Sequence, residues 1–187
     1  GIAFGTPPRR APQATPLTYG ATFKLKYIGN KWPYQGPGVE PPDPPPGDLY
    51  VGPATQSNRF ANWFPSLAPD GAVKLQLTSA TRTNGAPVLN NDIVQLVTTE
   101  ATVGAYNTLG AWKASHFLYY YTVGHSGQDW ELRLPSYRVA GAPIYLDDEV
   151  IFLSRAFPYQ RLTADLVQPD YLTTRFGEWA YWKLVPL

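Results

Sequence analysis

Only two histidines, His116 and His125, occur in the sequence, and imidazole is the side chain most often used for general acid–base and metal chemistry. Neither histidine has a Cys or a Glu at the spacing of a metal site. Ser115 directly precedes His116, but adjacency along a chain is not the geometry in which a histidine activates a serine. The histidines therefore predict neither a metal centre nor a hydrolytic enzyme.

Three consecutive acidic residues, Asp147-Asp148-Glu149, are of the type that binds metals or transfers protons. In one of two similar segments they take the place that Asn90-Asn91-Asp92 takes in the other, where Asx side chains favour a turn. We therefore expect turn formation here. The sequence also lacks the Gly-x-Ser-x-Gly, Walker and Gly-x-Gly-x-x-Gly motifs, so we expect no enzyme, no metal and no cofactor.

The two similar segments are residues 85–97 and 141–153. Both open with Gly-Ala-Pro, carry an Asp seven residues after the glycine, and continue with apolar residues at every second position. This pattern predicts a turn followed by a strand with one buried face. Because a repeated segment is a stronger signal than any single residue, we expect an internally repeated fold.

Composition favours strands. Charged residues make up 16% of the chain and aromatic residues 14%, and there are 16 glycines and 20 prolines among 187 residues. Many aromatics and turn formers with few charges are typical of all-β proteins. A net charge of +1 gives no case for a nucleic-acid partner, and zero cysteines exclude disulfides. No apolar run approaches the roughly 18 residues of a membrane helix, so we expect a soluble chain.

Alternating residues predict strands in three units, at about 17–79, 85–135 and 141–187. Each unit closes with a similar strand, in which apolar residues alternate with charged or amide residues. The apolar residues expected to face inward are Val73, Leu75, Trp130, Leu132, Trp182 and Leu184. The segment around Trp63 is predicted to be a loop. Three such units predict a single β-trefoil with pseudo-threefold symmetry, which is a short closed barrel capped by hairpins.

Residues 1–16 are predicted to form an extended arm, because four prolines disfavour both a helix and a central strand. A second Pro-rich stretch, residues 33–47, predicts a polyproline-like surface loop. We expect the arm to lie against a surface outside the 17–187 domain, and its removal to change stability by at most about 1 kcal/mol. The arm residues expected to contact a neighbouring chain are Ile2, Phe4, Arg9 and Arg10.

One short motif carries a family resemblance. Gln128-Asp129-Trp130 matches the Gln-x-Trp motif of ricin-type lectin repeats. With the terminal Trp182 and the threefold pattern, the sequence resembles the ricin-B-like and MIR-type β-trefoil lectin domains over about residues 17–187. The motif is intact in the second unit alone, because Gly71 and Ala180 occupy the position equivalent to Gln128 in the first and third units. In that family the pair chiefly supports the core, and the resemblance implies a non-catalytic, lectin-like carbohydrate-binding module.

Candidate sugar sites are aromatic side chains beside amide, acid or histidine side chains. Flat rings stack on sugar C–H faces while polar groups bind hydroxyls. These candidates are Asn62, Trp63, Asn107, Trp112, His116, Asp170 and Trp179. The favoured site is Trp112 with Asn107 and His116, since these residues lie beside the intact motif. The same aromatics are also of the type that fills a barrel or anchors a protein interface.

Two functions remain open at this point. The first is lectin-like recognition of a glycan. The second is a structural subunit of a larger homo- or hetero-oligomeric assembly, such as a virion or surface layer, in which the N-terminal arm and the Pro-rich loop contact neighbours. Both favour an extracellular or virion location. A trefoil-type protease inhibitor is third, since long loops could enter a cleft, but no residue marks a reactive bond.

Overall fold

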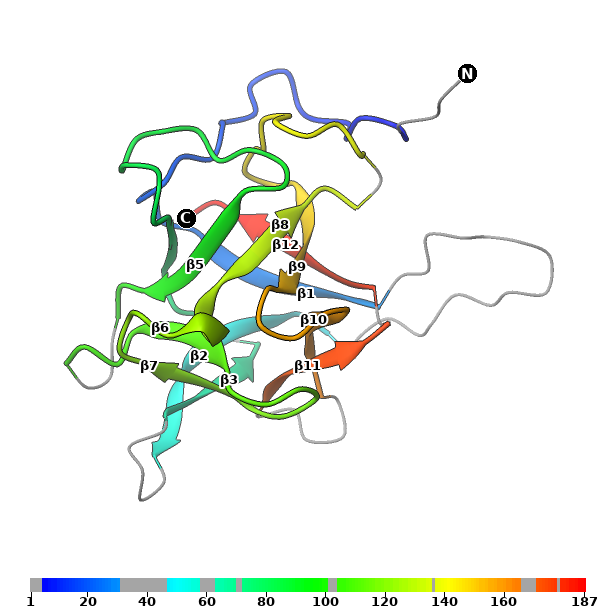
Figure 1. The fold of residues 1–187 in the computed structure, drawn as a ribbon. Coiled ribbons are helices and arrows are strands. Elements are labelled where there is room, and N and C mark those ends of the chain that lie inside the picture. Colours follow the sequence, from blue (N-terminus) through cyan, green and yellow to red (C-terminus); the bar gives the residue numbers. More distant parts are fainter. Residues whose placement is uncertain are drawn as a thin grey trace.

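The computed structural model describes residues 5–30, 47–57, 63–69, 72–100, 104–135, 137–165, 171–177 and 179–187. Within these ranges the chain forms twelve strands and one short 3-10 helix, so the prediction of an all-β protein is confirmed (Figure 1). The elements are β1 (Lys24–Asn30), β2 (Leu49–Ser57), β3 (Trp63–Ala68), β4 (Leu75–Thr78), β5 (Ile93–Thr98), β6 (Thr108–Ala111), β7 (Leu118–Tyr121), η1 (Ser126–Gln128), β8 (Trp130–Arg133), β9 (Glu149–Ser154), β10 (Gln160–Ala164), β11 (Leu172–Phe176) and β12 (Ala180–Val185).

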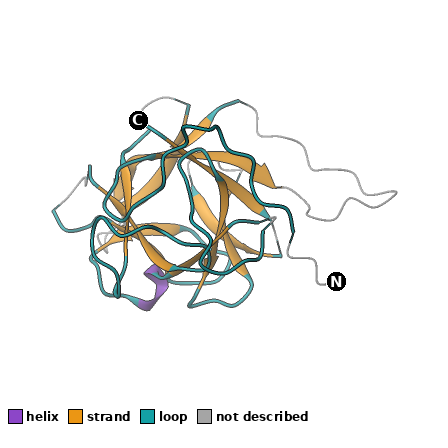
Figure 2. Cartoon of the chain, turned by 90° about the horizontal axis from the view of Figure 1, so that it is seen from above, coloured by secondary structure: helices purple, strands orange, loops and turns teal. Residues whose placement is uncertain are grey.

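Antiparallel pairing closes the sheet on itself. Within the described residues, nine strands form a ring in the order β9, β12, β1, β2, β3, β7, β6, β5 and β8, and β8 pairs back to β9. Outside the ring, β4 pairs with β5, and β11 pairs with β10 beside β9. Seen from above, the strands surround a common centre (Figure 2). Closure removes the free edges at which an open sheet would pair with another chain.

This closed nine-strand barrel corrects the fold assignment made from the sequence. The strand pairing is that of an antiparallel barrel, so the predicted β-trefoil and the resemblance to Gln-x-Trp lectin domains are wrong. Gln128 shows why the motif misled: the residue is 1% exposed, and within the described part of the chain its side chain bonds to its own loop, at Thr122, Gly124 and His125. A glutamine two residues before a core tryptophan stabilises a loop locally and identifies no family.

Internal repetition is nevertheless visible in a cycle of three backbone hydrogen bonds. The amide of Val88 donates to the carbonyl of Leu17 (3.0 Å), that of Ile144 to Val88 (3.1 Å), and that of Leu17 to Ile144 (2.8 Å). All three side chains are fully buried. The segments 85–97 and 141–153 therefore occupy corresponding places in the barrel, and the segment at Leu17 takes a third.

The acidic segment Asp147-Asp148-Glu149 and the segment Asn90-Asn91-Asp92 form similar turns. The carboxylate of Asp92 accepts from the amide of Leu89 (3.0 Å), and that of Asp148 accepts from the amide of Tyr145 (2.9 Å). Asp147 has a φ of 72°, in the left-handed region that Asp and Asn tolerate best among residues with a side chain. Asp148 is therefore part of a turn.

The barrel core contains every residue that alternation predicts to face inward. Val73, Leu75, Trp130, Leu132, Trp182 and Leu184 are each at most 3% exposed, so this prediction is confirmed. The two core indoles are also satisfied: the N–H of Trp130 donates to the carbonyl of Leu109 (3.3 Å), and that of Trp182 to Leu162 (3.0 Å). Large rings thus enter the core without leaving a buried donor unpaired.

The segment around Trp63 is a strand, where the sequence predicts a loop. Trp63–Ala68 forms β3, which pairs with β2 on one side and with Tyr120 of β7 on the other. Pro65 and Ser66 break the apolar alternation, which is why the strand escapes detection. The β2–β3 ladder has register shifts on either side of Ala54, the Cα partner of Pro65. A proline is tolerated at such an irregularity.

The described part of the arm, residues 5–16, lies across one end of the chain's own barrel (Figure 1). Isolated bridges join Gly5 to Tyr137 and Pro16 to Tyr145, and Arg10 pairs with Asp148. This differs from the expected placement outside the 17–187 domain, because the buried carboxylate of Asp148 attracts a cation. Ile2, Phe4 and most of the 33–47 loop lie outside the described residues. None of the helices in the described ranges has the length and apolarity to span a bilayer.

Candidate functional site

The β6–β7 hairpin presents an aromatic outer face. In β7, Leu118 and Tyr120 are buried and Tyr119 and Tyr121 are partly exposed, as strand alternation requires. The register sets Gly110 of β6 opposite Tyr119. A Cβ at Gly110 would lie 2.9 Å from Cζ3 of Trp112 and 2.7 Å from Cγ of Gln128. The absence of a side chain at residue 110 therefore lets Trp112 fold back over the hairpin.

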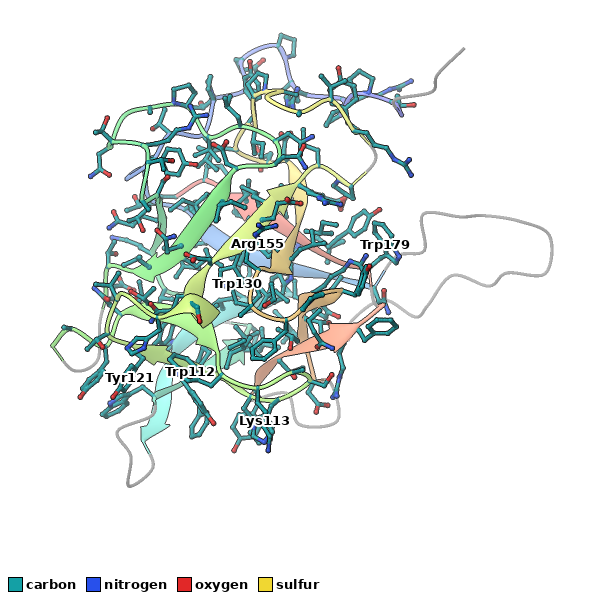
Figure 3. All side chains as sticks on the ribbon, viewed as in Figure 1. Trp112, Lys113, Tyr121, Trp130, Arg155 and Trp179 are labelled. Carbon is teal, nitrogen blue, oxygen red and sulfur yellow. The ribbon has the colours of Figure 1, made fainter. Side chains whose placement is uncertain are left out.

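Trp112 stands at the centre of a group of four rings, which we call the Trp112 cluster: Trp112, Tyr119, Tyr121 and His125. The indole centroid lies 5.3 Å from Tyr119, 5.7 Å from Tyr121 and 6.0 Å from His125. Figure 3 shows Trp112 and Tyr121 together at the hairpin. Trp112 remains 38% exposed, and partial burial raises the pKa of the Tyr119 hydroxyl. The cluster is a packed aromatic surface that solvent still reaches.

A rigid loop brings His125 to this surface. The carboxamide oxygen of Gln128 accepts from the amides of Gly124 and His125, both at 3.0 Å, and its nitrogen donates to the carbonyl of Thr122 at 2.7 Å. A Cβ on Gly127 would lie 1.9 Å from the carbonyl oxygen of Ala111, so the loop packs directly on β6. His125 is exposed, with Nε2 3.4 Å from the hydroxyl of Thr122.

Of the three residues in the favoured sugar site, only Trp112 belongs to this cluster. The Asn107 carboxamide accepts from the hydroxyl of the next residue, Thr108, at 3.0 Å. The ring of His116 packs on Phe117 at 5.0 Å. His125 is the histidine that contacts Trp112, and the signal that could have found the cluster is the outward pair Tyr119 and Tyr121.

The other predicted residues are dispersed. Trp63 lies half-buried in β3 and packs against the core. The backbone amide of Trp179 donates to the Asn30 carboxamide at 2.8 Å, and its ring lies 4.3 Å from the guanidinium carbon of Arg161. Asn62 and Asp170 lie outside the described residues. Among the described side chains, no three His, Cys, Asp or Glu residues group closely enough for a metal ion.

The role of Gly110 can be tested by replacement with alanine. The new methyl group would collide with Gln128 and Trp112, so one of them must move, and we expect a loss of about 1–2 kcal/mol in the free energy of unfolding. Urea denaturation measures this loss, and the NMR signal of the Trp112 indole N–H should shift. Gly124→Ala provides no such collision, since nothing lies within 4 Å of a Cβ there, although its positive φ adds backbone strain. An unshifted Trp112 signal in Gly110→Ala would contradict the proposed packing.

Comparisons with known proteins show a shared fold. No protein-family model matches the chain, and neither does any curated protein. It superposes on the lysenin pore with a TM-score of 0.62 and 11% identity, over 97% of this chain and 54% of that one. For the complex of lysenin with phosphocholine the TM-score is 0.62 and the identity 11%, over 92% and 47%. For a Caenorhabditis elegans protein of unknown function they are 0.55 and 10%, over 95% and 99%.

The chain thus spans about half the length of the lysenin structures. At 10% to 11% identity, these likenesses show a shared fold, and they show nothing about the ligand of this chain.

Proposed function

We propose that this protein is a non-catalytic recognition module that binds carbohydrate at the Trp112 cluster. The observation that carries the proposal is an indole that is 38% exposed although it packs against three other rings. An exposed, oriented ring is what the C–H face of a sugar stacks on. His125 and the Thr122 hydroxyl lie beside it to hydrogen-bond sugar hydroxyls.

Preorganisation supports this proposal. Gln128 fixes the loop that carries His125 through three hydrogen bonds. Gly110 leaves the space against which the Trp112 ring packs. A site that is ordered before binding loses little conformational entropy when its ligand arrives. Weakly binding ligands such as sugars gain most from such order, because their few contacts leave little free energy to offset ordering costs.

The alternative function, a structural subunit of an assembly, has weaker support. Arg10, proposed as an assembly contact, binds Asp148 of its own chain. Arg9 is exposed, while Ile2 and Phe4 lie outside the described residues. The assembly role would therefore rest on the first residues of the arm. Light scattering of the full chain and of a chain lacking residues 1–4 compares the two functions, because this deletion removes Ile2 and Phe4 and keeps the pair of Arg10 with Asp148.

Binding is tested with a glycan array followed by titration of the best glycan. Trp112→Ala is expected to weaken binding about fivefold or more, because truncating an aromatic residue that dominates a binding surface costs about 1 kcal/mol or more. Phe176→Ala is the matched control: Phe176 is 69% exposed and contacts Tyr159 outside the cluster. Equal losses in both variants, or an array without a binding glycan, would contradict the proposal.

Phosphocholine serves as a second probe in the same titration. The lysenin complex contains this ligand, and the faces of Trp and Tyr also attract quaternary ammonium groups. If no glycan binds, but phosphocholine binds saturably and Trp112→Ala abolishes that binding, the ligand class would be a choline headgroup and not carbohydrate.

A further inference from the structure

A second surface, on the outer face of β8, β9 and β10, is rich in arginine. The register sets Glu131 of β8 opposite Leu153 of β9, and Leu153 opposite Arg161 of β10. The neighbouring side chains Leu132 and Phe152 are fully buried, so the alternate positions Glu131, Leu153 and Arg161 point outward. Arg133 lies two residues beyond Glu131 on the same face.

Three of the arginines near this face have acidic partners. Arg133 binds Glu131, and a guanidinium nitrogen of Arg155 lies 4.0 Å from the same carboxylate. Arg175, opposite Arg161 on β11, pairs with Asp165 at 3.2 Å. These pairs neutralise much of the charge of the surface.

Arg161 has no such partner within the described part of the chain. Its Nε is buried without a hydrogen-bond acceptor, and its guanidinium is stacked on the ring of Trp179 at 4.3 Å. Burial, and then the positive charge of Arg133, lower the pKa of Arg161. A partly buried cation without a counterion is costly, and a bound anion would offset that cost.

Trp179 holds this guanidinium in place. Its backbone amide is fixed by the Asn30 carboxamide at 2.8 Å. Figure 3 shows Trp179 at the edge of the barrel. A guanidinium stacked by one face still presents the N–H groups at its edge, which match the two oxygens of a carboxylate, phosphate or sulfate. Stacking thus orients Arg161 for an oxyanion.

We propose that Arg161, stacked on Trp179 and assisted by Arg133, forms a binding site for an oxyanion group, which is a carboxylate, phosphate or sulfate carried by a ligand. Arg161 provides the edge donors and the unneutralised charge. Arg133 adds a second guanidinium, which is also paired with the Glu131 carboxylate. The site lies on strands other than the β6–β7 hairpin of the Trp112 cluster, and it does not depend on the proposed carbohydrate function.

The direct test is a titration with inorganic phosphate and sulfate at constant ionic strength, with chloride as the reference anion. NMR follows the Trp179 indole N–H and the Arg161 Nε–H. We expect saturable shifts of both signals with phosphate or sulfate. Arg161→Gln should weaken binding about tenfold or more, since a charge-assisted contact is lost. Arg161→Lys should weaken it less than Arg161→Gln, because the charge remains while the planar edge is lost.

Arg175→Gln is the matched control, because Arg175 is on the neighbouring strand and already has Asp165 as its counterion. We expect this variant to bind like the unchanged protein. Equal losses for Arg161→Gln and Arg175→Gln would indicate general charge attraction and overturn the proposal. So would unsaturable shifts, or saturable binding that survives in Arg161→Lys and Arg161→Gln alike. If Arg161→Gln fails to fold, the comparison of Arg161→Lys with Arg175→Gln decides in the same way.

Two further probes identify the source of the anion. A monosaccharide 6-sulfate presents the oxyanion on a sugar, and vesicles containing phosphatidic acid present it on a lipid surface. If one of these probes binds more tightly than the free ion, and the binding requires Arg161, that probe identifies the molecule that carries the oxyanion. Binding of the free ions alone, dependent on Arg161, restricts the site to small anions and still supports it.

Discussion

Replacement of Trp130 by alanine is expected to lower the free energy of unfolding by about 3–5 kcal/mol. Trp130 is fully buried, lies at the middle of the barrel in Figure 3, and is among the largest side chains of the core. Its truncation leaves a cavity that the closed ring of strands cannot fill by collapse. It also leaves the Leu109 carbonyl without the indole donor that now binds it at 3.3 Å.

Urea denaturation followed by far-UV circular dichroism measures this effect, with the slope of the transition checked against the unchanged protein. Trp112→Ala is the matched control, because it removes the same side chain from a site that is 38% exposed. We expect the control to cost about 1 kcal/mol, a value near the centre of the distribution for single substitutions. A neutral Trp130→Ala would be incompatible with the core as described.

Alternation in the sequence is enough to find the core and the fold class. A period of two shows which side of a strand is buried, and this is why Leu75, Trp130 and Leu184 are placed correctly. It does not show which strand pairs with which. The closed ring depends on contacts such as Trp63 with Tyr120 and Val94 with Trp130, which join distant parts of the chain. The assignment of a trefoil fails at this step.

The candidate site follows the same division. Trp112 can be selected from the sequence because it lies close to Asn107, His116 and the Gln128-Asp129-Trp130 motif along the chain. His125 cannot, because it reaches Trp112 only through the buried carboxamide of Gln128 and the contact of Gly127 with Ala111. The contact of Gly127 with Ala111 is tertiary, and the hydrogen bonds of Gln128 are local but depend on a side-chain orientation that residue types alone do not show. His116 is closer to Trp112 along the chain, but the fold of the 122–128 loop places His125 against the Trp112 ring instead.

The position of the arm leads to a different expectation for its effect on stability, and this expectation rests on one ion pair. Arg10 donates from Nε and Nη2 to the two carboxylate oxygens of Asp148, both at 2.9 Å. The Asp148 side chain is 3% exposed and that of Arg10 is 23% exposed. The guanidinium also lies 4.4 Å from the centroid of the Tyr145 ring. A terminal arm thus supplies the counterion of a carboxylate buried in a turn of the barrel.

Arg10→Ala is therefore expected to lower the free energy of unfolding by about 2–4 kcal/mol, because removing one member of a buried pair leaves the other charge unpaired. Deleting residues 1–16 should cost at least as much, well beyond the value of about 1 kcal/mol for surface changes. Urea denaturation of both proteins measures the losses.

Arg9→Ala is the matched control, since Arg9 is the adjacent, exposed arginine, and we expect it to change stability by less than about 0.5 kcal/mol. Asp148→Asn in the Arg10→Ala background should recover part of the loss. In the unchanged protein the Tyr145 amide donates to the Asp148 carboxylate at 2.9 Å, and a carboxamide oxygen can accept the same hydrogen bond without a buried charge. Equal stability of Arg10→Ala and Arg9→Ala would show that the arm does not anchor the barrel. A recovery in the double variant would show that the unpaired charge, rather than a lost arm contact, is the cause.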